Sequence, residues 1–260
     1  MAYDFIKVDR DGPITVFTLN RPDVMNAMHS PAHFEMDDAV NAFAADADQW
    51  VGIVTGAGER AFSAGNDLKH QATGGKMGSP PSGFAGLTSR FDLAKPLIAA
   101  VNGVAMGGGF EIALACDIIL ASEAAVFALP EPRVGLAALA GGLHRLPRAI
   151  GTKRAMGMIL TARRVSAAEG KELGFVHEVT SAGDLMTRAK ALAGEICQLG
   201  PMSIRASKEA VYRGLDEPSL EAALKGQNKY PAVAALYTSE DFKEGPLAFS
   251  QKRPPNWQGR

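Results

Sequence analysis

The sequence has little cysteine, almost no net charge and no long apolar run, and each shortage excludes a class of protein. Its two cysteines, Cys116 and Cys197, form no C-x-x-C pair, so neither a zinc site nor a disulfide framework is predicted. With 27 Lys and Arg against 28 Asp and Glu, the chain lacks the basic excess of nucleic-acid-binding proteins. No apolar run approaches the roughly 18 residues of a membrane-spanning helix. We therefore expect no nucleic-acid partner, no membrane partner and a reducing, cytoplasmic location.

What is present is an ordinary globular composition without a recognisable leader. Hydrophobic residues make up 47% of the 260 residues, with 28 glycines and 15 prolines, which gives disorder little support. The N-terminal stretch MAYDFIKVDRDG is charged and alternating, whereas a secretory signal has a basic run followed by an apolar one. A chain of this length can bury a large core.

Hydrophobic periodicity predicts strands that alternate with helices. Segment 5–19 alternates around Asp11-Gly12, which predicts a hairpin, and a helix is expected to start at Ser30 with Pro31 in its first turn. The buried face of that helix is predicted to hold Phe34, Ala39, Val40 and Phe43. Further strands are expected at 51–55, 96–104, 117–121 and 125–129, with Pro201, Pro218 and Pro231 at helix starts or breaks.

This order of elements predicts the α/β class with parallel strands. We expect one core, residues 1–195, followed by a helical C-terminal region, residues 196–260. Residues 71–89 have the least regular composition and are expected to form a wall of a pocket.

One motif, GAGERA at 56–61, matches the dinucleotide-binding fingerprint and keeps a nicotinamide-dependent oxidoreductase open as an alternative. A dinucleotide site also needs a helix that opens at the glycines and an acid roughly 20 residues later. Gly65 interrupts such a helix, and no acid lies between Asp67 and Asp92. His29 and His33 are four residues apart, but no third metal ligand is nearby, so they are interpreted as surface or core histidines.

Two glycine turns and two glutamates indicate a different chemistry. A triple glycine at 107–109 precedes an apolar helix, and a second turn, SAGND, lies at 63–67; exposed main-chain N–H groups in such turns can hold an oxyanion. Taken alone, Glu111 is an acid in the first turn of a helix and Glu131, in LPEPR, is a loop acid. Two carboxylates beside two oxyanion donors would, however, make an acid–base site.

Several ordered motifs together resemble the crotonase, or enoyl-CoA hydratase/isomerase, superfamily. They are LNRPDVMNAM at 19–28, AFSAGNDL at 61–68, KPLIAAVNGVAMGGGFEIALACDI at 95–118, ALPEPRVGL at 128–136, TARRVSAAEGKELGFVHEV at 161–179 and AFSQKRP at 248–254. The resemblance implies a spiral of βαβ units with a helical C-terminal region that forms trimers, commonly paired into hexamers. It also implies an acyl-CoA thioester substrate and no resident cofactor, because coenzyme A is carried by the substrate.

The resemblance also implies roles for particular residues. The oxyanion donors are expected to be the main-chain amides of Asn66 and Gly108, and the catalytic acids Glu111 and Glu131, which hold a water that adds to Cβ of a 2-enoyl-CoA. Glu131 is the simplest choice to return a proton to Cα. The coenzyme contacts are expected from Ala64, Asn66, Lys69, Phe249 and Lys252, the last two from a neighbouring subunit or the same one.

The sequence departs from the pattern of hydratases at three places. Asn66 replaces a usual alanine, Ala138 a proline and Leu139 a glycine near the catalytic water, and Val24 and Met25 occupy a stretch that often carries a basic residue. The alternatives within the family are a dehydratase acting on a polar or branched acyl-CoA and a double-bond isomerase. A non-catalytic CoA-binding scaffold is a further alternative.

Overall fold

The computed structural model describes residues 3–75 and 78–260, and its first two strands form the predicted hairpin. Strand β1 (Ile6–Asp11) pairs antiparallel with β2 (Ile14–Leu19), and Gly12 occupies the turn with φ of 56°. A positive φ suits glycine because it has no Cβ to collide with the main chain. The Asp11-Gly12 signal therefore located the turn correctly.

The first six strands after the hairpin alternate between two sheets as the chain advances, and the last two join the smaller and then the larger sheet. The larger sheet has the order β1-β2-β3-β5-β7-β10, in which β2 onward are parallel, and the smaller one has the order β4-β6-β8-β9. Their bounds are β3 Val51–Gly56, β4 Ala61–Ser63, β5 Leu97–Val101, β6 Val104–Met106, β7 Ile118–Ser122, β8 Val126–Ala128, β9 Val165–Ser166 and β10 Glu178–Thr180. Each turn of the spiral thus contributes one strand to each sheet.

The predicted single strand at 96–104 is wrong, because the chain forms β5 and β6 in different sheets. The break falls at Gly103, where an added Cβ would lie 2.5 Å from the carbonyl oxygen of Arg60. The next amide, that of Val104, donates to the same oxygen at 3.1 Å, which starts the smaller sheet. Hydropathy could not reveal the break because both strands are apolar.

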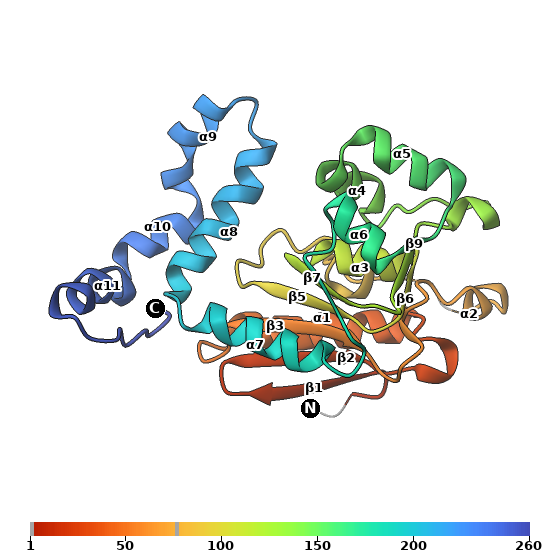
Figure 1. Ribbon diagram of the computed structural model, residues 1–260, viewed down its shortest axis with the longest axis horizontal. Helices are drawn as coiled ribbons and strands as arrows, with labels where there is room; N and C mark the ends of the chain where they lie inside the picture. The colour runs from red at the N-terminus through yellow and green to blue at the C-terminus, as the bar shows by residue number, and fades with distance from the viewer. Residues whose placement is uncertain (1–2, 76–77) are drawn as a thin grey trace.

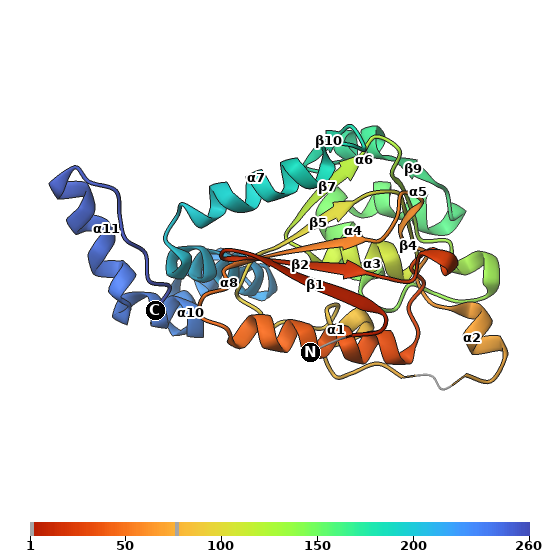
Figure 2. The same cartoon turned by 90° about the horizontal axis from the view of Figure 1, so that it is seen from below.

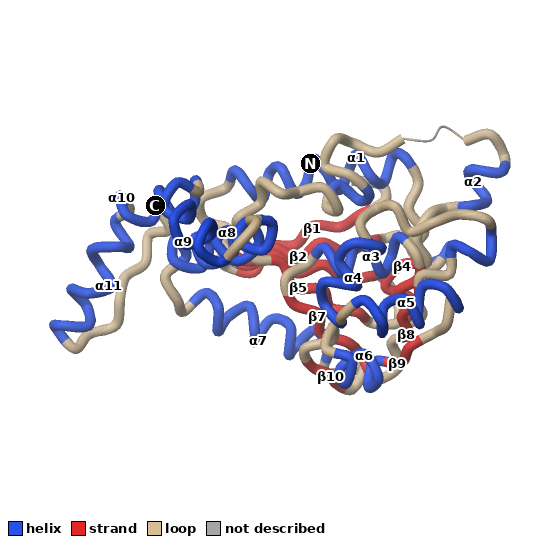
Figure 3. The backbone as a smooth tube through the Cα atoms, turned by 90° about the horizontal axis from the view of Figure 1, so that it is seen from above, coloured by secondary structure: helices blue, strands red, loops and turns tan. Residues whose placement is uncertain are grey.

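Among the described residues, seven α-helices precede the C-terminal region. They are α1 Ser30–Ala45, α2 Leu68–Ala72, α3 Gly108–Ala115, α4 Gly142–Ile150, α5 Thr152–Thr161, α6 Ala167–Leu173 and α7 Leu185–Cys197. The larger sheet lies between α1 and α7, and the smaller sheet lies beside α4, α5 and α6 (Figures 2 and 3). None of the described helices is long and apolar enough to cross a membrane.

Helix α1 begins at Ser30 as predicted, but Phe34 does not belong to its buried face. Phe34 is 50% exposed, whereas Val40 and Phe43 are buried with Met36. Successive residues turn by 100° around a helix, so Phe34 lies almost opposite Met36. Ala39 is buried as expected.

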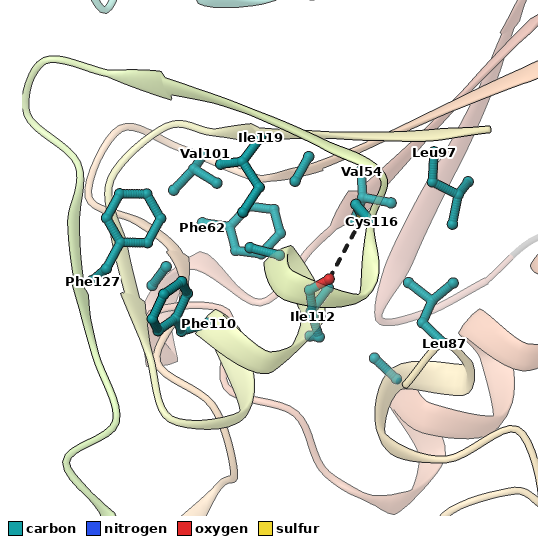
Figure 4. Close-up of a cluster of buried hydrophobic side chains, with 14 of the residues drawn as sticks. Val54, Phe62, Leu87, Leu97, Val101, Phe110, Ile112, Cys116, Ile119 and Phe127 are labelled. Carbon is teal, nitrogen blue, oxygen red and sulfur yellow. Dashed lines mark hydrogen bonds between the residues drawn. The ribbon is translucent and has the colours of Figure 1, made fainter. Parts of the chain in front are cut away.

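The main hydrophobic cluster anchors α3 between the sheets. Phe110 packs against Phe127 of β8 at 5.2 Å between ring centroids, and Cys116 Sγ donates to the carbonyl of Ile112 at 3.5 Å (Figure 4). Phe62 of β4 is fully buried in the same cluster. The apolar side chains therefore fix the position of α3. The other face of its first turn takes no part in this packing and can carry functional groups.

Four further helices extend away from the sheets (Figure 1). They are α8 Pro201–Asp216, α9 Leu220–Gly226, α10 Pro231–Thr238 and α11 Glu240–Gln251. Pro201 and Pro231 are the first residues of their helices, and Pro218 lies between α8 and α9, as predicted. The expected division at 195/196 falls in the last turn of α7, and the division into two regions stays a prediction.

Candidate active site

Three neighbouring strands of the smaller sheet place the predicted site residues at one edge. Strands β4, β6 and β8 are parallel, and Asn66, Gly108 and Glu131 follow their carboxyl ends in that order. The Gly107 amide donates to the Ala128 carbonyl at 2.9 Å, which joins the ends of β6 and β8. Ligands of α/β proteins bind at the carboxyl ends of parallel strands.

The two glycine turns touch each other. Gly65 has φ of +86°, and a Cβ added there would lie 2.6 Å from the Met106 carbonyl oxygen and 2.8 Å from the Gly108 nitrogen. No side chain fits at this position because the obstructing atoms are main-chain atoms. Because Asn66 follows Gly65 directly, its amide is only one residue away from this contact with Gly108.

Neither of these two amides has an acceptor among residues 3–75 and 78–260. Asn66 and Met28 form an isolated β-bridge, but the Asn66 amide takes no part in its hydrogen bonds. The Met28 N–H donates to the Gly65 carbonyl, and the Asp67 N–H donates to the Met28 carbonyl. The Asn66 side chain donates from Nδ2 to Gln71 Oε1 at 2.8 Å, so it is held toward α2. Gly108 is the first residue of α3, where an amide has no intrahelical partner. Two adjacent donors without acceptors can stabilise an oxyanion.

Glu111 lies in the first turn of α3 and is buried, with 3% of its surface exposed. Its Oε1 accepts a hydrogen bond from the Gly142 amide at 2.8 Å, where α4 begins. Burial, together with the negative charge of Glu131, raises the pKa of Glu111 to about 7 despite that bond. A carboxyl that titrates near neutral pH can exchange protons with a substrate.

Glu131 is half-buried and lies beside the glycine triplet. A Cβ added to Gly107 would approach Glu131 Oε1 to 2.8 Å, and Oε2 is buried without a hydrogen-bond partner among the described residues. Burial raises the pKa of Glu131. A buried carboxylate oxygen without a hydrogen-bond partner destabilises the folded protein, so such an oxygen usually binds a ligand or a water molecule.

The pKa of Glu111 predicts a pH-dependent effect of Glu111→Gln on stability. The pKa of the Glu111 carboxyl rises from 4.5 in the unfolded chain to about 7 in the folded protein, so folding favours its protonated form. Its contribution to the free energy of unfolding is fully present below the unfolded pKa and is lost as pH rises through 7. Glutamine removes this loss. From about pH 5 to about pH 8 the variant should therefore gain up to about 3 kcal/mol over the parent.

Denaturant unfolding of the parent and Glu111→Gln at the two pH values measures this gain. A stability difference that does not change with pH would show that Glu111 keeps an ordinary pKa in the folded protein.

The structure does not bring the expected coenzyme contacts together within one chain. Ala64 is half-buried near Asn66, and Lys69 is exposed on α2. Phe249, on α11, is 88% exposed and Lys252 follows that helix. Helices α2 and α11 lie at opposite ends of the molecule (Figures 1 and 2), so the two groups can meet only across two copies of the chain. Within the described residues, no group of three His, Cys, Asp or Glu could hold a metal.

The structure adds one residue outside the predicted positions, Gly142, and singles out Phe84 within the predicted pocket-wall segment 71–89. Gly142 donates to Glu111, and Phe84 lies against Gly108, where an added Cβ would be 2.5 Å from Phe84 Cζ. The pair Gly141-Gly142 before α4 resembles the triplet before α3 and could have signalled Gly142. Composition indicated the segment 71–89 but not Phe84 in particular, because the contact of Phe84 with Gly108 is long-range.

The fingerprint GAGERA lacks the helix that nucleotide binding requires. After Gly56 the chain continues into β4 (Ala61–Ser63), a strand of the smaller sheet. The glycines therefore form the link between the two sheets rather than a phosphate-binding helix start.

Comparisons with known proteins find related chains over nearly the whole length of the sequence. Residues 9–260 match the family model described as enoyl-CoA hydratase/isomerase. The carnitinyl-CoA dehydratase of Salmonella typhi is 44% identical over 262 residues, which cover 98% of each chain. The crystal structure of an enoyl-CoA hydratase from Mycobacterium marinum has a TM-score of 0.92 at 39% identity and covers 98% of this chain and 99% of its own. That of a carnitinyl-CoA hydratase from Mycobacterium avium has a TM-score of 0.79 at 38% identity and covers 100% of both.

Proposed function

Because the chain belongs to the enoyl-CoA hydratase/isomerase family, we propose that it adds water across the 2,3 double bond of a 2-enoyl-CoA thioester, or catalyses the reverse dehydration. The observation that carries the proposal is that two amides without acceptors among the described residues, the buried Glu111 and the half-buried Glu131 all follow the carboxyl ends of β4, β6 and β8. No resident cofactor is part of this proposal, since coenzyme A arrives with the substrate.

In the proposed reaction the thioester oxygen accepts hydrogen bonds from the Asn66 and Gly108 amides. These bonds stabilise the negative charge that develops on that oxygen as water attacks Cβ. Glu111 and Glu131 hold the water between them, and one carboxylate takes a proton from the water as its oxygen bonds to Cβ. A glutamate carboxyl, most simply that of Glu131, gives a proton to Cα, so that one water is added in total. The pKa of Glu111, about 7, supports proton exchange near neutral pH, and burial also raises the pKa of Glu131 above its usual value.

A dehydratase acting on a polar acyl-CoA is the second candidate. Relatives from Salmonella that are named carnitinyl-CoA dehydratase favour this candidate, and they match 98% of this chain. The chemistry at the two glutamates would be the same hydration in reverse, so the two candidates differ in the acyl group.

A direct assay tests the proposal. Incubation with crotonyl-CoA should remove the absorbance of the conjugated enoyl thioester, and crotonobetainyl-CoA serves as the polar comparison substrate. Separate titrations with CoA and NAD distinguish an acyl-CoA enzyme from the oxidoreductase alternative. NAD binding without CoA binding would contradict the proposal, and CoA binding without turnover of either thioester would favour a scaffold.

We further propose that the chain works as a homotrimer or a dimer of trimers in the cytoplasm. The C-terminal helices expose many large apolar side chains: Val211, Tyr212, Leu215, Leu220, Leu224, Tyr237, Phe242, Leu247 and Phe249. Surfaces of this kind are typical of contacts between proteins. A second copy would also bring Phe249 and Lys252 to the α2 end of its neighbour. Light scattering after size exclusion measures the assembly, and a monomer at micromolar concentration would contradict this part.

A further inference from the structure

One aromatic ring covers the glycine that we propose as an oxyanion donor. Phe84 begins the short 3-10 helix η2 (Phe84–Gly86), and its Cζ lies 2.5 Å from the point where a Cβ on Gly108 would be. The ring therefore contacts the Cα of Gly108 directly, and Phe84 itself is only half-buried. A thioester oxygen that meets the Gly108 amide would therefore bind to a residue that this ring contacts.

His33 of α1 packs against the Phe84 ring and holds it in place. The His33 and Phe84 rings are 4.4 Å apart between centroids, and His33 Nδ1 accepts a hydrogen bond from the Ala85 amide at 3.0 Å. Nδ1 must be unprotonated to accept, and burial lowers the pKa of His33 to about 4. The acceptor is therefore available at neutral pH.

The main chain at Phe84 is also unusual. Ala85 has φ of 53° and ψ of 27°, a left-handed conformation that L-residues with a Cβ avoid. The Phe84 amide donates to Thr88 Oγ1 at 2.9 Å, and the bond to His33 holds the next amide. Strained residues persist only where the surroundings hold them, and they cluster at functional sites.

We propose that Phe84 is a specificity-determining residue that limits the size of the acyl group, and that His33 is the positioning residue that holds it. This inference rests on the proposed function of the same site. A fixed aromatic wall leaves room for a short acyl group and obstructs a longer chain, since pocket walls discriminate by excluded volume.

Phe84→Ala tests the wall. We expect the ratio of kcat/KM for trans-2-octenoyl-CoA to that for crotonyl-CoA to rise by about tenfold or more, the discrimination expected of a hydrophobic pocket. Phe91→Ala is the matched control, because Phe91 is 82% exposed and its loss should leave the ratio unchanged. An unchanged ratio in Phe84→Ala would overturn the proposal.

His33→Leu and His33→Asn test the positioning role. Leucine fills the space but cannot accept the Ala85 amide, so it should raise the same ratio, whereas the amide oxygen of asparagine can accept and should restore the parent ratio. A merely structural role would lower thermal stability in both variants without moving the ratio, and that outcome would remove His33 from the proposal.

A binding measurement separates failure of this inference from failure of the proposed function. Butanoyl-CoA and octanoyl-CoA have no double bond to hydrate, so their dissociation constants report the pocket alone. In Phe84→Ala we expect octanoyl-CoA to gain affinity relative to butanoyl-CoA. If the parent hydrates neither enoyl thioester, hydration is wrong and this affinity ratio still decides whether Phe84 limits the acyl group.

Discussion

Glu111→Gln should lower turnover of the enoyl thioester by at least about a hundredfold while the chain stays folded. Glutamine can still accept the hydrogen bond from the Gly142 amide, so the local packing is retained. It cannot, however, take or give a proton in the way that a carboxyl group with a pKa of about 7 can. General acid–base catalysis contributes about 10² to 10⁴ in rate, which sets the expected loss.

Steady-state kinetics with crotonyl-CoA measure this loss, and Glu131→Gln should behave similarly because its carboxylate lies beside the glycine triplet. Glu123→Gln is the matched control: Glu123 is exposed after β7, and its replacement should leave turnover unchanged. Near-normal turnover in Glu111→Gln or Glu131→Gln would remove that glutamate from the mechanism.

Gly65→Ala should lower turnover by about 10² to 10³, the cost of losing an oxyanion donor. The added Cβ would lie 2.6 Å from the Met106 carbonyl and 2.8 Å from the Gly108 nitrogen, so the two glycine turns must move apart. The amides of Asn66 and Gly108 would then no longer converge on one oxygen. The left-handed φ of +86° adds backbone strain to the variant.

Gly74→Ala is a control that separates the backbone strain of a positive φ from the steric clash between the two glycine turns. Gly74 also has a positive φ, +78°, but nothing lies within 4 Å of the position of its Cβ. Both variants should lose stability through strain, whereas only Gly65→Ala should lose turnover in the fraction that remains folded. Equal turnover in the two variants, measured per folded molecule, would show that the contact between the turns does not serve catalysis.

The elements with strong local signals were predictable. The Asp11-Gly12 turn, the start of α1 at Ser30 and the proline-led starts of α8 and α10 depend on residues close in sequence, and each was found as expected. The division between β5 and β6 was not predictable, because Gly103 breaks the strand to meet Arg60 from a distant segment. Phe34 was assigned to the wrong face because its apolar character does not determine which side of α1 meets the core.

For the site, the sequence by itself determined which groups are available: two glycine turns at 63–67 and 107–109, and the carboxyls of Glu111 and Glu131 after apolar segments. Such features follow from local chemistry, since glycine permits turns that other residues avoid. Only the tertiary structure decided that β4, β6 and β8 are neighbours, that Gly65 touches Gly108, and that Phe84 covers it. These contacts depend on hydrogen bonds and packing between residues far apart in sequence, which no local pattern specifies.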